Sequence, residues 1–160
     1  MIRAAVVTIS DSVARGTRED RSGPAVQERV EQLGWTIAAS ELAPDDRDSI
    51  ARLLTDLSDR RGVSLILTTG GTGVAERDVT PEATRAVIDR EIPGLAELMR
   101  AEGRKSTIRA VLSRGIAGTR GRTLIVNLPG SPRGAVESLE AVAELAPHII
   151  DLLEGRTEHH

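Results

Sequence analysis

The chain has 160 residues, a formal net charge of −3 and no cysteine, and its length is that of one ordinary domain. The lone aromatic residue, Trp35, and the scattered basic side chains argue against base stacking and against an electrostatic surface for nucleic acid. The lack of cysteine removes disulfides and thiolate metal sites, and we expect a cytoplasmic protein with no nucleic-acid partner.

The first third of the chain predicts two strands separated by a helix. Residues 2–9 form an apolar run typical of a buried strand. This run meets Ser10 too early to be a signal peptide or a membrane span, so we expect no membrane association. A polar loop follows, Pro24 opens a helix that ends at Gly34, and residues 35–42 predict the second strand.

The middle of the chain repeats the alternation of strand and helix. After a turn at residues 43–46, a helical stripe ends near Gly62, and residues 63–68 predict a third strand. A glycine-rich loop then covers residues 69–80, and Pro81 suits the first turn of the next helix.

The last third contains the least regular part of the sequence. Pro93 separates two helices, after which residues 106–121 predict a short helix or strand. Residues 123–128 predict a further strand. The amphipathic region that reaches Leu153 predicts two helices divided near Pro147.

This alternation of strands and helices predicts an α/β fold with a mostly parallel sheet, covered by helices on both faces. We expect a single domain over residues 1–156. Residues 157–160 end in His159-His160, and we expect them to be a disordered tail that is either native or left by a cloning tag.

Polar clusters follow the predicted strands, at Ser10-Asp11, Asp45-Asp46, 69–78 and 127–131. Ligands of open α/β sheets bind beyond the carboxyl ends of the strands. We therefore expect these clusters to converge on one edge of the sheet.

The sharpest cluster is the glycine-rich run Thr68–Gly73. Missing side chains let a phosphate approach the backbone, and successive N–H groups form an anion-binding nest beside the next helix. The alternative is an ordinary turn with extra glycine. The Walker lysine is absent, and Glu76 stands where the dinucleotide pattern needs a small residue, so we disfavour a P-loop enzyme and a Rossmann dehydrogenase.

Carboxylates offer a candidate metal site. Asp45 and Asp78 lie on loops after successive predicted strands, where together they could hold Mg²⁺ beside substrate phosphates. Taken singly, each fits a turn residue or a helix cap better. Asp11 fits capping and ligand binding about equally, and Ser113 is expected on spacing alone to be solvent-exposed.

No side chain has the pattern of a histidine base, because we expect His148, beside Pro147, to be structural. A Ser-His-Asp or Cys-His mechanism is therefore unsupported. Phosphoryl and nucleotidyl transfer need no such base, since a phosphate nucleophile is already anionic near neutral pH.

Six groups of short motifs extend over nearly the whole chain, and they are Thr8-Ile9-Ser10-Asp11-Ser12, Asp20-Arg21-Ser22-Gly23-Pro24, Pro44-Asp45, Thr68–Gly73 with Arg77–Ala83, Leu112-Ser113-Arg114, and Asn127–Pro132. Together they resemble the MogA/MoaB family of molybdopterin adenylyltransferases, which is related to the G domains of plant Cnx and animal gephyrin. The combination is specific, although any one motif alone would be weak.

The resemblance implies a three-layer α/β/α fold that assembles as a homotrimer or, in some members, a hexamer. It implies Mg²⁺-dependent adenylylation of molybdopterin by ATP, in which the terminal phosphate of molybdopterin attacks the α-phosphate and pyrophosphate leaves. Handover of the product to a molybdenum-inserting enzyme is also expected.

By position, the resemblance assigns Asp45 and Asp78 to Mg²⁺ and the triphosphate, and Ser113 to contact with the transferred group. The residues assigned to substrate and nucleotide binding are Ser10, Asp11, Gly70, Gly71, Thr72, Gly73, Glu82, Asn127, Pro129, Gly130 and Ser131. Two alternatives stay open: a MoaB-type protein that binds molybdopterin without catalysis, and a scaffold module of the gephyrin kind.

Overall fold

The computed structural model describes residues 1–156, and the predicted tail, 157–160, lies outside them. The strands are β1 (Arg3–Ile9), β2 (Thr36–Ala43), β3 (Leu65–Thr69), β4 (Arg90–Glu91), β5 (Ala117–Arg120) and β6 (Thr123–Leu128). The α-helices are α1 (Asp11–Ala14), α2 (Ser22–Gln32), α3 (Arg47–Thr55), α4 (Thr80–Arg85), α5 (Pro93–Arg104), α6 (Pro132–Ala143) and α7 (Ala146–Leu153). Two further helical segments are η1 (Asp56–Arg60), a π-helical continuation of α3, and η2 (Ile108–Leu112), a 3-10 helix.

The strands form one six-stranded sheet in the order β2-β1-β3-β6-β5-β4. The first four strands of this order are parallel, while β5 runs antiparallel to β6 and β4 antiparallel to β5. The predicted mostly parallel sheet is confirmed. The antiparallel edge adds a hairpin between β5 and β6 that the sequence pattern did not predict.

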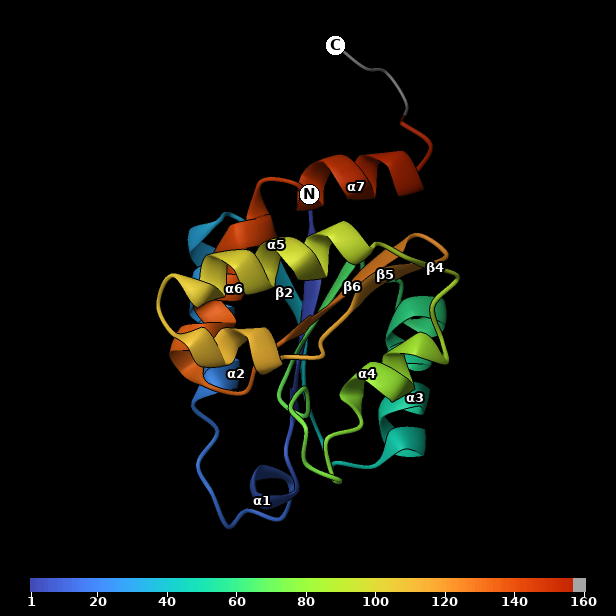
Figure 1. Ribbon diagram of the computed structural model, residues 1–160. Helices are drawn as coiled ribbons and strands as arrows, with labels where there is room; N and C mark the ends of the chain where they lie inside the picture. The colour runs from blue at the N-terminus through green and yellow to red at the C-terminus, as the bar shows by residue number, and fades with distance from the viewer. Residues whose placement is uncertain (157–160) are drawn as a thin grey trace.

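Helices cover both faces of this sheet (Figure 1), which confirms the predicted three-layer arrangement. One apolar cluster joins α2, α5, α6 and α7 to one face of the sheet, and a second joins α3, η1 and α4 to the other. In β3, Leu65 and Leu67 belong to the first cluster and Ile66 to the second, because successive side chains of a strand point to opposite faces.

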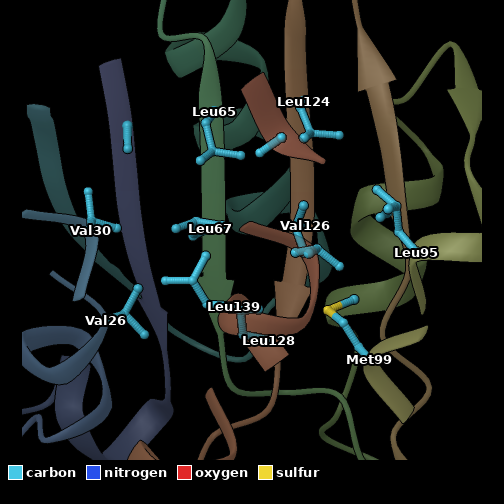
Figure 2. Close-up of a cluster of buried hydrophobic side chains, with 14 of the residues drawn as sticks. Val26, Val30, Leu65, Leu67, Leu95, Met99, Leu124, Val126, Leu128 and Leu139 are labelled. Carbon is cyan, nitrogen blue, oxygen red and sulfur yellow. The ribbon is translucent and has the colours of Figure 1, made fainter. Parts of the chain in front are cut away.

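The first cluster is built almost entirely from aliphatic side chains, as the near absence of aromatic residues requires. Figure 2 shows Val26 and Val30 of α2, Leu139 of α6 and Met99 of α5 beside the central strands. Among the helices of residues 1–156, none combines the length and the apolar character that crossing a membrane requires.

Three local predictions need correction. The predicted polar loop after Ser10 contains the short helix α1, because the Ser10 side chain accepts a hydrogen bond from the amide of Val13 and caps it. The helix predicted from Pro24 begins at Ser22, where the Asp20 carboxylate accepts from the amide of Gly23 over 3.0 Å. The irregular stretch 106–121 contains both η2 and β5.

The parallel strands end together at one edge of the sheet. Thr8 of β1 pairs with Thr69 of β3, which pairs in turn with Leu128 of β6. The loops that follow these strands therefore begin side by side, as the sequence predicted. In Figure 1 this edge lies at the bottom, near α1, whereas α7, which contains His148, lies at the opposite end.

Candidate functional site

Direct hydrogen bonds connect the three loops at this edge. The amide of Gly70 donates to the carbonyl of Leu128 over 3.1 Å, and the Thr69 hydroxyl donates to the carbonyl of Pro129 over 2.7 Å. The amide of Ser10 donates to the carbonyl of Ala43 over 3.0 Å. The glycine-rich loop is thus joined to the turn after β6, and the segment after β1 is joined to the end of β2.

The glycine-rich loop is fixed through its carbonyl groups. Those of Gly70 and Gly71 accept from the hydroxyl and the amide of Thr80, and those of Thr72 and Gly73 accept from the backbone amide and Nε of Arg114. Within residues 1–156, the amides of Gly71, Thr72 and Gly73 have no hydrogen-bond partner. The loop therefore offers three successive donors, the arrangement that binds an anion.

Two glycines of this loop are required by backbone conformation. Gly70 has a φ of 107° and Gly71 a φ of 68°. L-residues that carry a side chain rarely adopt backbone conformations in this region. The amide of Gly70 is already bonded to Leu128, so a cradle of amides begins at Gly71. Because α4 has only six residues, the loop amides, rather than a long helix dipole, carry the phosphate-binding prediction.

Asp11 and Asp45 hold each other by reciprocal hydrogen bonds. The amide of Asp11 donates to Oδ2 of Asp45 over 3.0 Å, and the amide of Asp45 donates to Oδ1 of Asp11 over 2.8 Å. Partial burial, followed by the charges of Asp11 and Asp78, raises the pKa of Asp45, although the bond from the Asp11 amide partly offsets this rise. Asp46 instead caps α3 through the amide of Ser49.

Asp78 lies near the end of the glycine-rich loop, two residues before the start of α4. Its Oδ2 accepts from the amide of Ala75 over 3.0 Å, and its own amide donates to the carbonyl of Ala75 over 3.0 Å. These two bonds fix the turn that precedes α4. The carboxylate stays half-buried at the wall of the site.

Arg114 is a prominent site residue to which the sequence analysis assigned no role. Its guanidinium donates to the carbonyls of Gly73 and Asp78. It also forms an ion pair with the carboxylate of Glu82, in which the shortest N–O distance is 2.7 Å. The hydrogen bonds from Arg114 lower the pKa of Glu82. The signal in the sequence was the motif Leu112-Ser113-Arg114, from which a role was assigned to Ser113 alone. Ser113 is half-buried rather than solvent-exposed as predicted.

Asn127 is placed below the surface of the site. It is 1% exposed, its Oδ1 accepts from the amide of Ile116, and its Nδ2 donates to the hydroxyls of Thr68 and Thr84. The side chain thus joins β6 to β3 and α4. Nearby, Ser131 caps α6 by accepting from the amide of Gly134 over 3.1 Å.

Two cavities open on either side of the glycine-rich loop. The larger, of about 610 Å³, adjoins α5, η2 and α6, and the smaller, of about 420 Å³, adjoins α1 and the end of β2. Residues on the walls of both are Gly71, Asp78, Gly130 and Ser131. The structure therefore brings together almost all of the predicted site residues around two adjoining spaces.

The predicted residues divide between these spaces. The larger cavity is lined by Thr72, Gly73, Ser113, Asn127 and Pro129, and the smaller by Ser10, Asp45 and Gly70. Asp11 and Glu82 line neither. The larger cavity also receives three arginines, Arg100, Arg109 and Arg133, which the sequence analysis missed because they come from three separate helical segments and share no spacing.

The carboxylates suit a metal ion that brings its own oxygen ligands. Within residues 1–156, no group of three or more His, Asp or Glu side chains is gathered that could hold a metal by itself. Asp45 and Asp78 nevertheless line one cavity and interact electrostatically. Mg²⁺ is usually bound by one or two carboxylates together with substrate phosphates, so these residues fit it.

Comparisons with known proteins agree with this geometry. A family model described as a probable molybdopterin binding domain matches residues 5–148. The molybdopterin adenylyltransferase of Helicobacter pylori strain J99 is 42% identical, over 96% of this chain and 89% of the relative. That of Escherichia coli K12 is 40% identical, over 96% of this chain and 86% of the relative. A crystal structure of the molybdopterin biosynthesis enzyme MoaB from Thermus thermophilus is 54% identical with a TM-score of 0.92, covering 97% and 98% of the two chains.

Proposed function

We propose that this chain, which belongs to the family of probable molybdopterin binding domains, is a molybdopterin adenylyltransferase of molybdenum cofactor biosynthesis. The reaction uses ATP and Mg²⁺. The terminal phosphate oxygen of molybdopterin forms a bond to the α-phosphorus of ATP, and the bond between the α-phosphorus and the bridging oxygen breaks to release pyrophosphate. The named relatives support this assignment, since they are molybdopterin adenylyltransferases at 40–42% identity over most of the chain.

The observation that carries the proposal is the shared wall between the two cavities. A reaction that joins two substrates through their phosphates needs two adjoining spaces with an anion-binding surface where they meet. Gly71 and Asp78 lie on that wall, and the free amides begin at Gly71. One substrate in each cavity would bring the two phosphate groups to the glycine-rich loop.

The residues of the chain act by binding and orienting rather than by proton transfer. The amides of Gly71, Thr72 and Gly73 stabilise phosphate oxygens as negative charge is redistributed, and Ser113 donates a hydrogen bond to the transferred group. The nucleophile is a phosphate that is already anionic, which accounts for a site without a histidine base. Pre-positioning of both substrates supplies much of the rate.

Asp45 and Asp78 would hold Mg²⁺, which neutralises charge on the triphosphate when it is bound. Their own roles follow from their anchors. Asp45 keeps Oδ1 available after Oδ2 accepts from the amide of Asp11, and Asp78 keeps Oδ1 available after Oδ2 accepts from Ala75. Both carboxylates are therefore oriented before any ligand arrives.

The experiment combines purified protein with molybdopterin and ATP, with and without Mg²⁺, and follows pyrophosphate together with adenylylated pterin. We expect equal amounts of the two products, formed only when all three components are present. ATP breakdown that does not depend on molybdopterin would contradict the proposal. Replacement of Mg²⁺ by EDTA is the control for metal dependence.

A second candidate function is molybdopterin binding without catalysis. The sequence left this alternative open for a MoaB-type protein, and the chain is 54% identical to the molybdopterin biosynthesis enzyme MoaB of Thermus thermophilus. Tight binding of molybdopterin with no pyrophosphate release by wild-type protein would select this function. The same measurements thus separate the two candidates.

The assembly and the next protein in the sequence of reactions are also part of the proposal. We expect a homotrimer or a hexamer, to be measured by light scattering after gel filtration. Adenylylated molybdopterin is a bound, activated intermediate, so we expect direct handover to a molybdenum-inserting enzyme. A titration of the loaded protein with such an enzyme would detect this contact.

A further inference from the structure

Arg114 connects the segment after η2 to both ends of the turn that carries Asp78. Its backbone amide donates to the carbonyl of Thr72 over 2.8 Å, and its Nε donates to the carbonyl of Gly73 over 2.7 Å. One terminal nitrogen donates to the carbonyl of Asp78 over 2.8 Å. The residue therefore spans the loop from Thr72 to Asp78.

Glu82 holds the guanidinium from the side of α4. The two terminal nitrogens of Arg114 donate to Oε2 and Oε1 of Glu82 over 2.7 and 3.3 Å. Arginine presents its donors in a rigid planar fork, whereas lysine carries a compact ammonium on a flexible stem. Only arginine can reach the Gly73 carbonyl, the Asp78 carbonyl and the Glu82 carboxylate together.

The pair stands behind the residues that face the cavities. Arg114 and Glu82 line neither cavity, whereas Asp78 lines both and Ser113 lines the larger one. The side chains of Arg114 and Glu82 are 37% and 43% exposed, and partly exposed ion pairs contribute little to global stability. The arrangement therefore serves the local geometry of the loop more than the stability of the domain.

We propose that Arg114 and Glu82 are positioning residues for adenylyl transfer, an inference that rests on the proposed function. Arg114 holds Asp78 in place relative to its own neighbour Ser113, and Glu82 keeps the guanidinium in the orientation that makes this possible. Neither side chain touches a substrate. The role of Glu82 is thus different from the ligand binding that the family motif implies.

The test compares Arg114→Lys and Glu82→Gln with wild type. Because small displacements of reacting groups are costly, we expect Arg114→Lys to lower kcat about 10- to 100-fold. Neither the KM for ATP nor that for molybdopterin should change by more than about twofold, since neither residue contacts a substrate. Glu82→Gln should lower kcat less and should cost nothing further in the Arg114→Lys background, because Glu82 acts through Arg114.

The matched control is the ion pair of Arg85 and Glu91, whose charged atoms lie 3.1 Å apart. Arg85 belongs to α4, as Glu82 does, and neither Arg85 nor Glu91 lines a cavity of the site. Arg85→Lys and Glu91→Gln should keep wild-type kinetics. If they lower kcat as much as the Arg114 and Glu82 variants, the effect is a general one of α4 and the inference is wrong. If Arg114→Lys fails to fold, Glu82→Gln decides the question by its kcat.

Hydrogen exchange gives a readout that does not depend on turnover. Arg114→Lys should speed exchange of the amides of Ala75 and Asp78, which are hydrogen-bonded within the turn, while leaving the Tm close to that of wild type. Absence of turnover in the wild-type protein would overturn the proposed function. Amide exchange that is the same in Arg114→Lys as in wild type would overturn the positioning role, whatever the turnover. Wild-type turnover with unchanged kcat in both variants would overturn the inference alone.

Discussion

A methyl group on Gly73 would lie 2.8 Å from Oδ2 of Asp78, so the two residues can keep their positions only while residue 73 is glycine. Carbon atoms in ordinary contact stay about 3.5–4.0 Å from their neighbours. The missing side chain thus gives the Asp78 carboxylate its place beside the loop amides. The spacing of the glycines is a requirement of the site as well as of the backbone.

We therefore expect Gly73→Ala to displace the Asp78 carboxylate and to lower kcat by about tenfold or more. The φ of Gly73 lies outside the left-handed region, so alanine strains no backbone dihedral, and the reduced entropy of the unfolded chain offsets part of the stability lost by displacing the carboxylate. Steady-state kinetics and thermal unfolding measure the two effects.

Gly94→Ala is the matched control for this change. Gly94 also lies outside the left-handed region, and a methyl group there would meet no atom within 4 Å. It should leave kcat unchanged. Equal activity of Gly73→Ala and wild type would show that the Asp78 carboxylate can move without consequence.

Asp45→Asn should raise stability at neutral pH. Burial raises the pKa of Asp45 above its usual 3.8, so the folded protein binds a proton at Asp45 more tightly than the unfolded chain does. The stability gained from this protonation is complete below the unfolded pKa and is lost as the pH rises through the folded pKa. The amide removes the destabilising charge, and each kcal/mol gained raises the Tm of a chain of this size by about 2–4 °C.

Thermal unfolding in EDTA between pH 4 and pH 8 tests this prediction, with the exposed Asp48→Asn as control. The difference from wild type should be largest near pH 7 and should narrow toward pH 4. A lower Tm of Asp45→Asn at every pH would contradict it.

Asp45→Asn should also need more Mg²⁺ for activity, because one proposed carboxylate ligand is lost. An unchanged Mg²⁺ titration would direct attention to Asp11, since Asp46 is occupied as a helix cap.

Asn127→Ala should destabilise the domain. Its side chain is buried, and its removal leaves the amide of Ile116 and the hydroxyls of Thr68 and Thr84 with fewer partners. Each buried polar group left unpaired costs about 1–3 kcal/mol. Urea unfolding measures the loss, and Thr84→Val, which removes one partner of the same network, should show a smaller one. Unchanged stability of Asn127→Ala, with weaker substrate binding, would favour direct contact with a ligand.

The central strands could be predicted from the sequence because their apolar runs are buried on both faces. Leu65, Ile66 and Leu67 are each at most 1% exposed. The two exposed residues of β4 carry no such pattern, and Gly118 interrupts the four residues of β5. Short edge strands depend on their partners, so local sequence does not reveal them.

The site was predictable where its residues follow strands directly. Asp11 and Asp45 are 34 positions apart, yet each comes shortly after a strand of the same parallel sheet, and the register of β1 and β2 brings them together. Arg114 follows no strand, and the partners of its side chain lie 32–41 positions earlier. Such contacts arise from the packing of α5 and η2 and leave no periodic signal.

The most direct test of the account follows label from ATP labelled at the α-phosphorus in wild-type protein and in Asp78→Asn. Wild type should transfer the label to molybdopterin. Asp78→Asn should bind molybdopterin and unfold at a Tm close to that of wild type, but should lower kcat at least about a hundredfold, which corresponds to about 2.7 kcal/mol. Full label transfer by Asp78→Asn, or wild-type protein that binds both substrates and transfers no label, would contradict the account.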